Sequence, residues 1–394
     1  MKKKAIISLL VPVLLFSLVP TAWAADSATC YAETQTLLAG RTANYTWAGG
    51  TSNSDDWDVF GLTRDGIHVS ESYVNSAETF VPTAGSAVSD CARAILTLSA
   101  CGATVSDLSL VGVTEESKLS GSNDVIYSLL ALDCKGYTVP TDGISRASLT
   151  DLLLSLQQSD NAWGYSYPDG GTWQTPWGTD VDSTAMAITA LAPYYGDTAV
   201  KTAVDNALDW LKTQQITDGT FGYMGSASVE STAQVIVALT TLGIDPTSWN
   251  GKHAVDAMCT MAVSGGGFLS TYTGAYDETS TAQGYYALVA YERFKAGKTT
   301  LYDMSDVTTP FYDTDKKKTP SAATTSPRHK AAESTVSVPL ATETTVSSAK
   351  TADGGIGLYV MLSVGVLFGT AWLCEHRRLQ ENYDGGTKRE KIFR

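Results

Sequence analysis

The chain has little histidine, few cysteines and an excess of acidic over basic residues. It holds four histidines and six cysteines among 394 residues, and no two cysteines stand in a C-x-x-C spacing. This usage does not describe a zinc site or a disulfide-stapled scaffold. Acidic residues outnumber basic ones by 41 to 27, and the net charge of −14 argues against nucleic acid as a partner. Strand patterns are also few, which favours an all-α protein.

Both ends of the chain carry patterns of export and membrane insertion. Residues 1–24 combine three lysines, an apolar run and a final Ala-Trp-Ala, which predicts a cleaved signal peptide. Residues 356–374 are uncharged and long enough to cross a bilayer as one transmembrane helix. Six basic residues follow this stretch and only Lys350 lies close before it, so residues 375–394 are expected to form a short cytoplasmic tail. The folded part is therefore predicted to lie outside the cell membrane.

Composition separates a disordered segment from a folded one. Residues 313–352 are mostly Ser, Thr, Ala, Pro and Lys, and they contain no aromatic residue. Such a segment buries too little apolar surface to offset the entropy of the chain, which predicts a disordered stalk. Residues 26–305 remain, and they are long enough for one large core.

An internal repeat organises this central part. Ser-Thr-Ala, four further residues and Ala-Leu recur at 183–191, 231–239 and 280–288, at spacings of 48 and 49 residues. Weaker copies end at Leu62, Leu98 and Leu132, which makes six. A period of this length is typical of repeat architectures.

Two kinds of helix alternate within the repeat. The Ser-Thr-Ala helices are apolar on nearly every side, as in 233–239, and such helices belong in an interior. The helices before the last three copies carry apolar residues at i, i+3, i+4 and i+7, as at 149–156, 204–211 and 255–262, and are half exposed. This alternation predicts an α6/α6 toroid with six inner and about six outer helices. An open solenoid is the competing arrangement, but the polar capping repeats that it requires are missing from the sequence.

One motif occurs twice in the central part of the chain. A shorter copy contains Gln158 and Trp163, and the fuller copy consists of Ala207, Trp210, Leu211, Gln215, Gly219 and Phe221. The fuller copy is similar to the QW repeat of squalene and hopene cyclases, with Phe in place of the last Trp. Together with the six-fold repeat, the two copies resemble the terpene cyclase and prenyltransferase superfamily of α/α toroids over about residues 50–300, which implies the toroid fold. The segments 56–57, 243–246 and 301–306 look most like those of bacterial surface proteins with prenyltransferase-like repeats.

The catalytic motifs known in this superfamily can be compared with the residues of this chain. Class II terpene cyclases carry D-x-D-D, whose middle Asp protonates an alkene or epoxide. Here Asp180 and Asp182 match the first two acids and Ser183 replaces the last, so the resemblance implies Asp182 as the proton donor if the chain is a cyclase. Protein prenyltransferases need a zinc held by Asp, Cys and His. This chain offers Asp182 without the Cys or the His, and it also lacks the reactive Cys and Gln of complement thioester domains.

The sequence favours binding without catalysis. Residues 181–187 resemble a segment of the corrinoid-binding toroids of the intrinsic factor and transcobalamin group, which makes a corrinoid a candidate ligand. The incomplete D-x-D-D, the missing zinc ligands and the external location predict a surface protein that binds a small molecule or glycan, with no cofactor and no metal. One alternative is a class II terpene cyclase-like enzyme that uses Asp182 and Asp180. The other is an adhesive protein that uses its outer surface.

The predicted ligand contacts lie at one rim of the ring. Inner helices run parallel, so the acids in their first turns gather on one face, where they either cap the helices or contact a ligand. We expect contact first from Asp182 and Glu230, with Gln234 and Gln283 one turn further in. The acids at the rim are Asp55, Asp56, Asp90, Asp124, Asp182, Glu230 and Glu278.

Aromatic residues in the loops are expected to form a wall on the same face. The connection 159–179 carries Trp173 and Trp177, which can stack on a sugar, a corrin or an apolar substrate. Tyr223 and Tyr272 follow the next two turns and complete the wall. Trp163 holds the QW position and is expected to be structural.

Two cysteines are expected to be neighbours in the inner layer. Cys101 and Cys134 lie ten or eleven residues into successive inner helices. They form either a disulfide, if their Cα atoms come within about 7 Å, or two small buried thiols. His68 and His253 have no partner pattern and are not expected to bind a ligand.

Overall fold

The computed structural model describes residues 26–47, 54–80, 86–223, 225–270 and 274–313. These residues belong to a compact unit that ends at Asp313. The predicted signal peptide, transmembrane helix and tail lie outside the described residues, as does the stalk beyond Asp313. No helix in the described ranges is long and apolar enough to cross a membrane.

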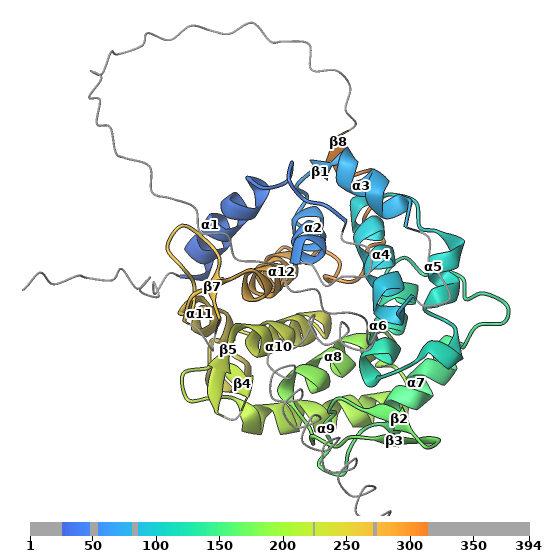
Figure 1. Ribbon diagram of the computed structural model, residues 1–394. Helices are drawn as coiled ribbons and strands as arrows, with labels where there is room; N and C mark the ends of the chain where they lie inside the picture. Colours follow the sequence, from blue (N-terminus) through green and yellow to red (C-terminus); the bar gives the residue numbers. More distant parts are fainter. Residues whose placement is uncertain (1–25, 48–53, 81–85, 224, 271–273, 314–394) are drawn as a thin grey trace, which may run out of the picture. The chain divides into compact units, whose positions relative to one another are not determined.

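Among the described residues, six helices form a closed inner ring (Figure 1). Each contacts the next one along the chain, and the last contacts the first. Nearly all side chains of the fourth and fifth of these helices are buried, as predicted for helices that are apolar on every side. The inner helices are α2 (Ser54–Arg64), α4 (Val88–Cys101), α6 (Ser122–Asp133), α8 (Val181–Leu191), α10 (Val229–Thr241) and α12 (Glu278–Lys295).

Six further helices of the described chain lie outside this ring. Each packs on inner helices: α3 and α5 on α4, α7 on α6, α9 on α8, α11 on α10, and α1 on α2 and α12. The two-layer ring predicted from the repeat is therefore confirmed, and the open solenoid is excluded. The outer helices are α1 (Ser27–Ala39), α3 (Glu71–Glu78), α5 (Asp107–Gly112), α7 (Arg146–Ser155), α9 (Thr198–Gln214) and α11 (Ala254–Cys259).

Short β-hairpins lead into the last three inner helices, a feature that the all-α prediction missed. β2 (Tyr167–Asp169) pairs with β3 (Thr172–Gln174) before α8, and β4 (Phe221–Tyr223) pairs with β5 (Ser226–Ser228) before α10. β6 (Phe268–Leu269) pairs with β7 (Tyr276–Asp277) before α12. Strands of two or three residues are too short to give an alternating pattern in the sequence.

The Ser-Thr-Ala repeat marks the junction of hairpin and inner helix. The backbone N–H of Ser183 donates to Asp180, the N-cap of α8, at 2.7 Å. Thr184 Oγ1 accepts the backbone N–H of Trp163 at 3.0 Å and so fastens the loop before the helix. The repeat therefore encodes a capped helix start and the attachment of the preceding loop. The same two bonds join Ser231 to Ser228, Thr232 to Phe221, Ser280 to Asp277 and Thr281 to Phe268.

The segment after α12 crosses the C-terminal ends of the inner helices. The backbone N–H of Met304 donates to the carbonyl of Cys134, and that of Phe311 donates to the carbonyl of Cys101, both at 2.8 Å. β8 (Tyr312–Asp313) then pairs in parallel with β1 (Val69–Ser70). The packed unit thus extends past residue 305, the predicted end of the domain.

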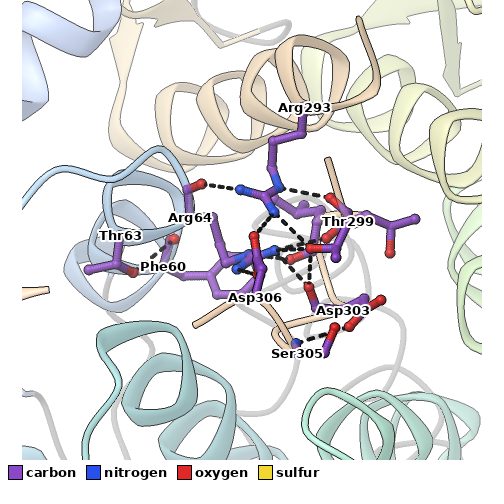
Figure 2. Close-up of polar contacts among 10 residues, drawn as sticks. Phe60, Thr63, Arg64, Arg293, Thr299, Asp303, Ser305 and Asp306 are labelled. Atoms are coloured by element: carbon purple, nitrogen blue, oxygen red, sulfur yellow. Dashed lines mark hydrogen bonds and ion pairs between the residues drawn. The ribbon is translucent and has the colours of Figure 1, made fainter. Parts of the chain in front are cut away.

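Two buried arginines hold this C-terminal segment (Figure 2). Arg64, at the end of α2, pairs with Asp306 at 2.8 Å and donates to the carbonyls of Leu301 and Asp303. Arg293 of α12 pairs with the same carboxylate and donates to the carbonyl of Arg64 at 2.7 Å. Partial burial raises the pKa of Asp306, but the bonds from both guanidinium groups outweigh it and bring the pKa to about 2. The segment is therefore fixed to both sides of the seam between α2 and α12.

Candidate functional site

The first turns of the inner helices carry the predicted rim acids, so the sequence placed these residues correctly. Several of them have basic or hydroxyl partners and serve the helix starts, the structural role weighed above. Asp56 and Asp90 both pair with Arg93, Asp124 accepts two hydrogen bonds from Ser120, and Glu278 pairs with Arg41.

Asp182 differs from these acids because one of its carboxyl oxygens, Oδ1, has no basic or hydroxyl partner. Its Oδ1 is buried and accepts no hydrogen bond, while the residue as a whole is half-buried. Burial raises the pKa of this carboxyl group to about 7, and the negative charges of Asp180 and Glu230 act in the same direction, whereas a hydrogen bond with the side chain of Ser231 lowers the pKa. Near neutral pH, Asp182 therefore exists as a mixture of carboxylic acid and carboxylate.

The two neighbouring acids are held in fixed positions. Asp180 accepts the backbone N–H and the hydroxyl of Ser183 at 2.7 and 2.8 Å. Burial raises the pKa of Asp180, and these two bonds from Ser183 oppose the rise. Glu230 accepts the hydroxyl of Ser228 at 2.7 Å and that of Ser280. Of these three acids, Asp182 alone has a buried oxygen without a hydrogen bond, and it is therefore the one best placed to exchange a proton.

A pair of buried amides lies one turn further in, as predicted. Gln234 Nε2 donates to Gln283 Oε1 at 3.0 Å and to the hydroxyl of Tyr286 at 2.6 Å. The two glutamines are 6% and 4% exposed. These bonds join α10 to α12 and lead from the acidic rim towards the interior of the ring.

An aromatic cluster, here called the inner aromatic cluster, comprises Trp57, Phe60, Tyr127, Tyr286 and Tyr302. The ring centroids of Trp57 lie 5.9 Å from Tyr127 and 6.4 Å from Tyr286, and those of Phe60 and Tyr302 are 5.2 Å apart. Burial raises the pKa of the Tyr286 hydroxyl, and the charge of Asp182 contributes to the rise, so the acid and the cluster act on each other electrostatically. Sequence reasoning missed this cluster. Its signal was the presence of large aromatics on helices otherwise built from small and aliphatic residues.

Of the loop aromatics predicted to form a wall, Trp177 contacts two tyrosines of its own loop. Trp177 is 43% exposed, and its ring lies 5.9 Å from Tyr165 and 6.0 Å from Tyr167. Trp173 stands in β3 opposite Pro168. Trp177 thus joins two tyrosines of its own loop.

Three other aromatic residues were predicted near this face. The side chain of Tyr223 and the whole of Tyr272 lie outside the described residues. Trp163 is 1% exposed, and its Nε1 donates to the carbonyl of Leu153 at 2.8 Å. The QW tryptophan therefore packs within the fold.

Cys101 and Cys134 are free thiols in the structure. Both are buried, and Cys134 Sγ donates to the carbonyl of Ala131 at 3.2 Å. Of the two predicted arrangements, the structure has the buried thiols. In the part of the chain that the structure describes, no group of three or more His, Cys, Asp or Glu side chains is arranged to hold a metal ion.

Comparison with known proteins gives structural likeness at low identity. No protein family model matches the chain, and no curated protein matches it. Among solved structures, it is similar to the type II terpene cyclase MstE from Scytonema without ligand, at 12% identity and a TM-score of 0.44, over 67% of this chain and 99% of that one. It is also similar to ent-copalyl diphosphate synthase from Streptomyces platensis, at 18% identity and a TM-score of 0.37, over 66% of this chain and 50% of that one.

Proposed function

We propose that this chain is an acid catalyst of the class II terpene cyclase type, in which Asp182 protonates a double bond or an epoxide of an apolar substrate. The observation that carries the proposal is the state of Asp182: a buried Oδ1 with no hydrogen-bond donor and a pKa of about 7. A general acid is most effective when its pKa lies near the operating pH, because it is then both present as the acid and ready to give up its proton.

The reaction needs one proton and returns one. The O–H bond of the Asp182 carboxylic acid breaks, and the proton takes the electron pair of a C=C bond or opens an epoxide. The resulting carbocation is attacked by the next double bond of the substrate, which closes a ring, and the last cation loses a proton. The product of an alkene is an isomer of the substrate. Asp180 and Glu230 support this step by raising the pKa of Asp182, so that it holds its proton at neutral pH.

The interior below the acid suits an apolar substrate. The inner aromatic cluster offers ring faces, on which a hydrocarbon chain packs and a positive charge is stabilised. The amides of Gln234 and Gln283 lie one turn along α10 and α12 from the rim acids, and they are suited to orient a hydroxyl or carbonyl of the substrate. We further propose, from the patterns at residues 1–24 and 356–374, that the protein acts outside the cytoplasm while anchored in the membrane. A neutral isoprenoid is then a more suitable substrate than a diphosphate.

One observation favours a second function, binding without chemistry. Ser183 stands where D-x-D-D cyclases have their last acid, and its hydroxyl donates to Asp180. Asp182 therefore lacks the neighbouring carboxyl group that orients the catalytic acid in that motif. In this case the ring holds a small molecule, such as a glycan or a corrinoid, and releases it unchanged.

The two functions separate in one experiment. The full chain is incubated with linear polyprenyl alcohols and their epoxides, thermal stabilisation is recorded, and extracts are analysed by gas chromatography with mass spectrometry. The proposal expects cyclic products of unchanged mass with wild type and with Glu278→Gln, a rim acid that pairs with Arg41 at the surface, and none with Asp182→Asn. Stabilisation of wild type and Asp182→Asn alike, with no product from either, would instead support binding alone.

A further inference from the structure

The ring is completed where the first outer helix meets the last one. α1 packs against α11, and several hydrogen bonds join the two and the turn after α11. The backbone N–H of Ser27 donates to Asp256 Oδ1 at 3.3 Å, and that of Gly267 donates to Thr34 Oγ1 at 3.1 Å. Later residues of α1 thus contact later residues of the segment that begins with α11. The two segments run in the same direction along this seam.

This register brings two cysteines together. Cys30 follows Ser27 by three residues, and Cys259 follows Asp256 by three residues. Three residues in an α-helix return to nearly the same face, so a contact between Ser27 and Asp256 in parallel helices is followed by one between Cys30 and Cys259. Both cysteines are buried free thiols in the structure, at 2% and 0% exposure.

The electrostatic environment agrees with this geometry. A hydrogen bond with the Cys30 thiol is the largest cause that raises the pKa of Cys259, ahead of burial. The other described cysteines have different neighbours. Cys134 donates to the carbonyl of Ala131, and a side chain added at Gly112 would meet the sulfur of Cys91.

We infer that Cys30 and Cys259 form a disulfide that joins the first and last outer helices and locks the ring closed. Each thiol gives up one proton and one electron, a bond forms between the two sulfurs, and a disulfide compound of the surroundings takes up both electrons and both protons to become two thiols. Export through an oxidising compartment, as the first 24 residues predict, supplies such compounds. Because the bond encloses the chain from α1 to α11, it restricts the unfolded state strongly and stabilises the ring. This inference is independent of the proposed reaction at Asp182.

The test is a map of free and bonded thiols. The full chain is refolded in a buffer of reduced and oxidised glutathione, denatured without reductant, alkylated and digested, and the peptides are identified by mass spectrometry. The inference expects a peptide with Cys30 linked to one with Cys259, while the other four cysteines are alkylated. The double variant Cys101→Ser and Cys134→Ser is the matched control and keeps the link.

Three results would overturn the inference. They are alkylation of all six cysteines without reductant, a link between Cys101 and Cys134 in place of the inferred one, and glutathione retained on Cys30 or Cys259. A melting scan adds a second measurement on the folded protein. Reductant lowers the melting temperature of the wild type if the bond is present and leaves that of Cys30→Ser unchanged. Equal melting temperatures of the wild type with and without reductant also count against the bond.

Discussion

The state of Asp182 predicts that its removal stabilises the protein, and that the gain depends on pH. Its pKa rises from 3.8 to about 7 on folding, so between these values the folded state binds more protons than the unfolded one. Stability therefore falls as the pH rises through this window, and the full cost is present above pH 7. At 1.36 kcal/mol for each pKa unit, the cost is about 4 kcal/mol at most. The half-buried position of the residue reduces it, and we expect a gain of roughly 1–3 kcal/mol at pH 8 for Asp182→Asn.

The assay is urea unfolding of wild type and Asp182→Asn at pH 4 and pH 8. Asn matches the shape of Asp and is neutral at both pH values, so the difference between the two proteins is expected to be near zero at pH 4 and to favour the variant at pH 8. Asp56, whose pKa burial also raises to about 7, affects both proteins equally and cancels. A variant that is less stable than wild type at pH 8, or a difference that does not change with pH, would show that folding does not raise the pKa of Asp182.

Three further changes test the fold that positions this site. Asp306→Asn removes the carboxylate shared by two buried arginines and is expected to lower the free energy of unfolding in urea by about 2 kcal/mol at pH 7. Because the pKa of Asp306 is lowered to about 2 in the folded state, this advantage of the wild type should vanish as the pH falls from 3.8 towards 2. A difference that stays constant over this pH range would contradict the ion pairs. Trp163→Ala should cost about 3–5 kcal/mol through the cavity that it leaves, and a loss below 1 kcal/mol would refute a packed QW residue. Gly164→Ala puts a Cβ 1.9 Å from a backbone oxygen and should lower the melting temperature, whereas Gly196→Ala meets open space; equal melting temperatures would argue against the loop as described.

The architecture could be predicted because the sequence repeat reflects interactions between residues that are close in the chain. Each Ser-Thr-Ala copy encodes a capped start, a loop attachment and a buried helix, and these depend on residues close in the chain. The alternation of buried and half-exposed helices then left two arrangements, and closure of α12 on α2 decided between them. Depth within the ring also followed from helical spacing, which placed Gln234 and Gln283 one turn inside the rim.

The features that the sequence did not predict or decide depend on contacts between segments far apart in the chain. The crossing of residues 299–313 beneath the ring arises from Arg64 and Arg293, whose shared partner Asp306 is far from Arg64 in the sequence. The inner aromatic cluster draws on α2, α6, α12 and that same segment, so the large aromatics on the separate helices gave no sign that their rings meet. For Cys101 and Cys134, depth along neighbouring helices left a disulfide and two buried thiols as alternatives, because depth does not fix the direction in which a side chain points. The structure has the second alternative.

The central claim is that Asp182 gives its proton to carbon, and deuterium labelling tests it most directly. The full chain is equilibrated in D₂O and incubated with a linear polyprenyl alcohol, and the products are analysed by mass spectrometry and NMR. The account predicts a cyclic product with one deuterium at the carbon where cyclisation begins, formed by wild type and not by Asp182→Asn. A labelled product made equally by Asp182→Asn, or a wild type that binds the alcohol and returns it unlabelled and linear, would contradict it.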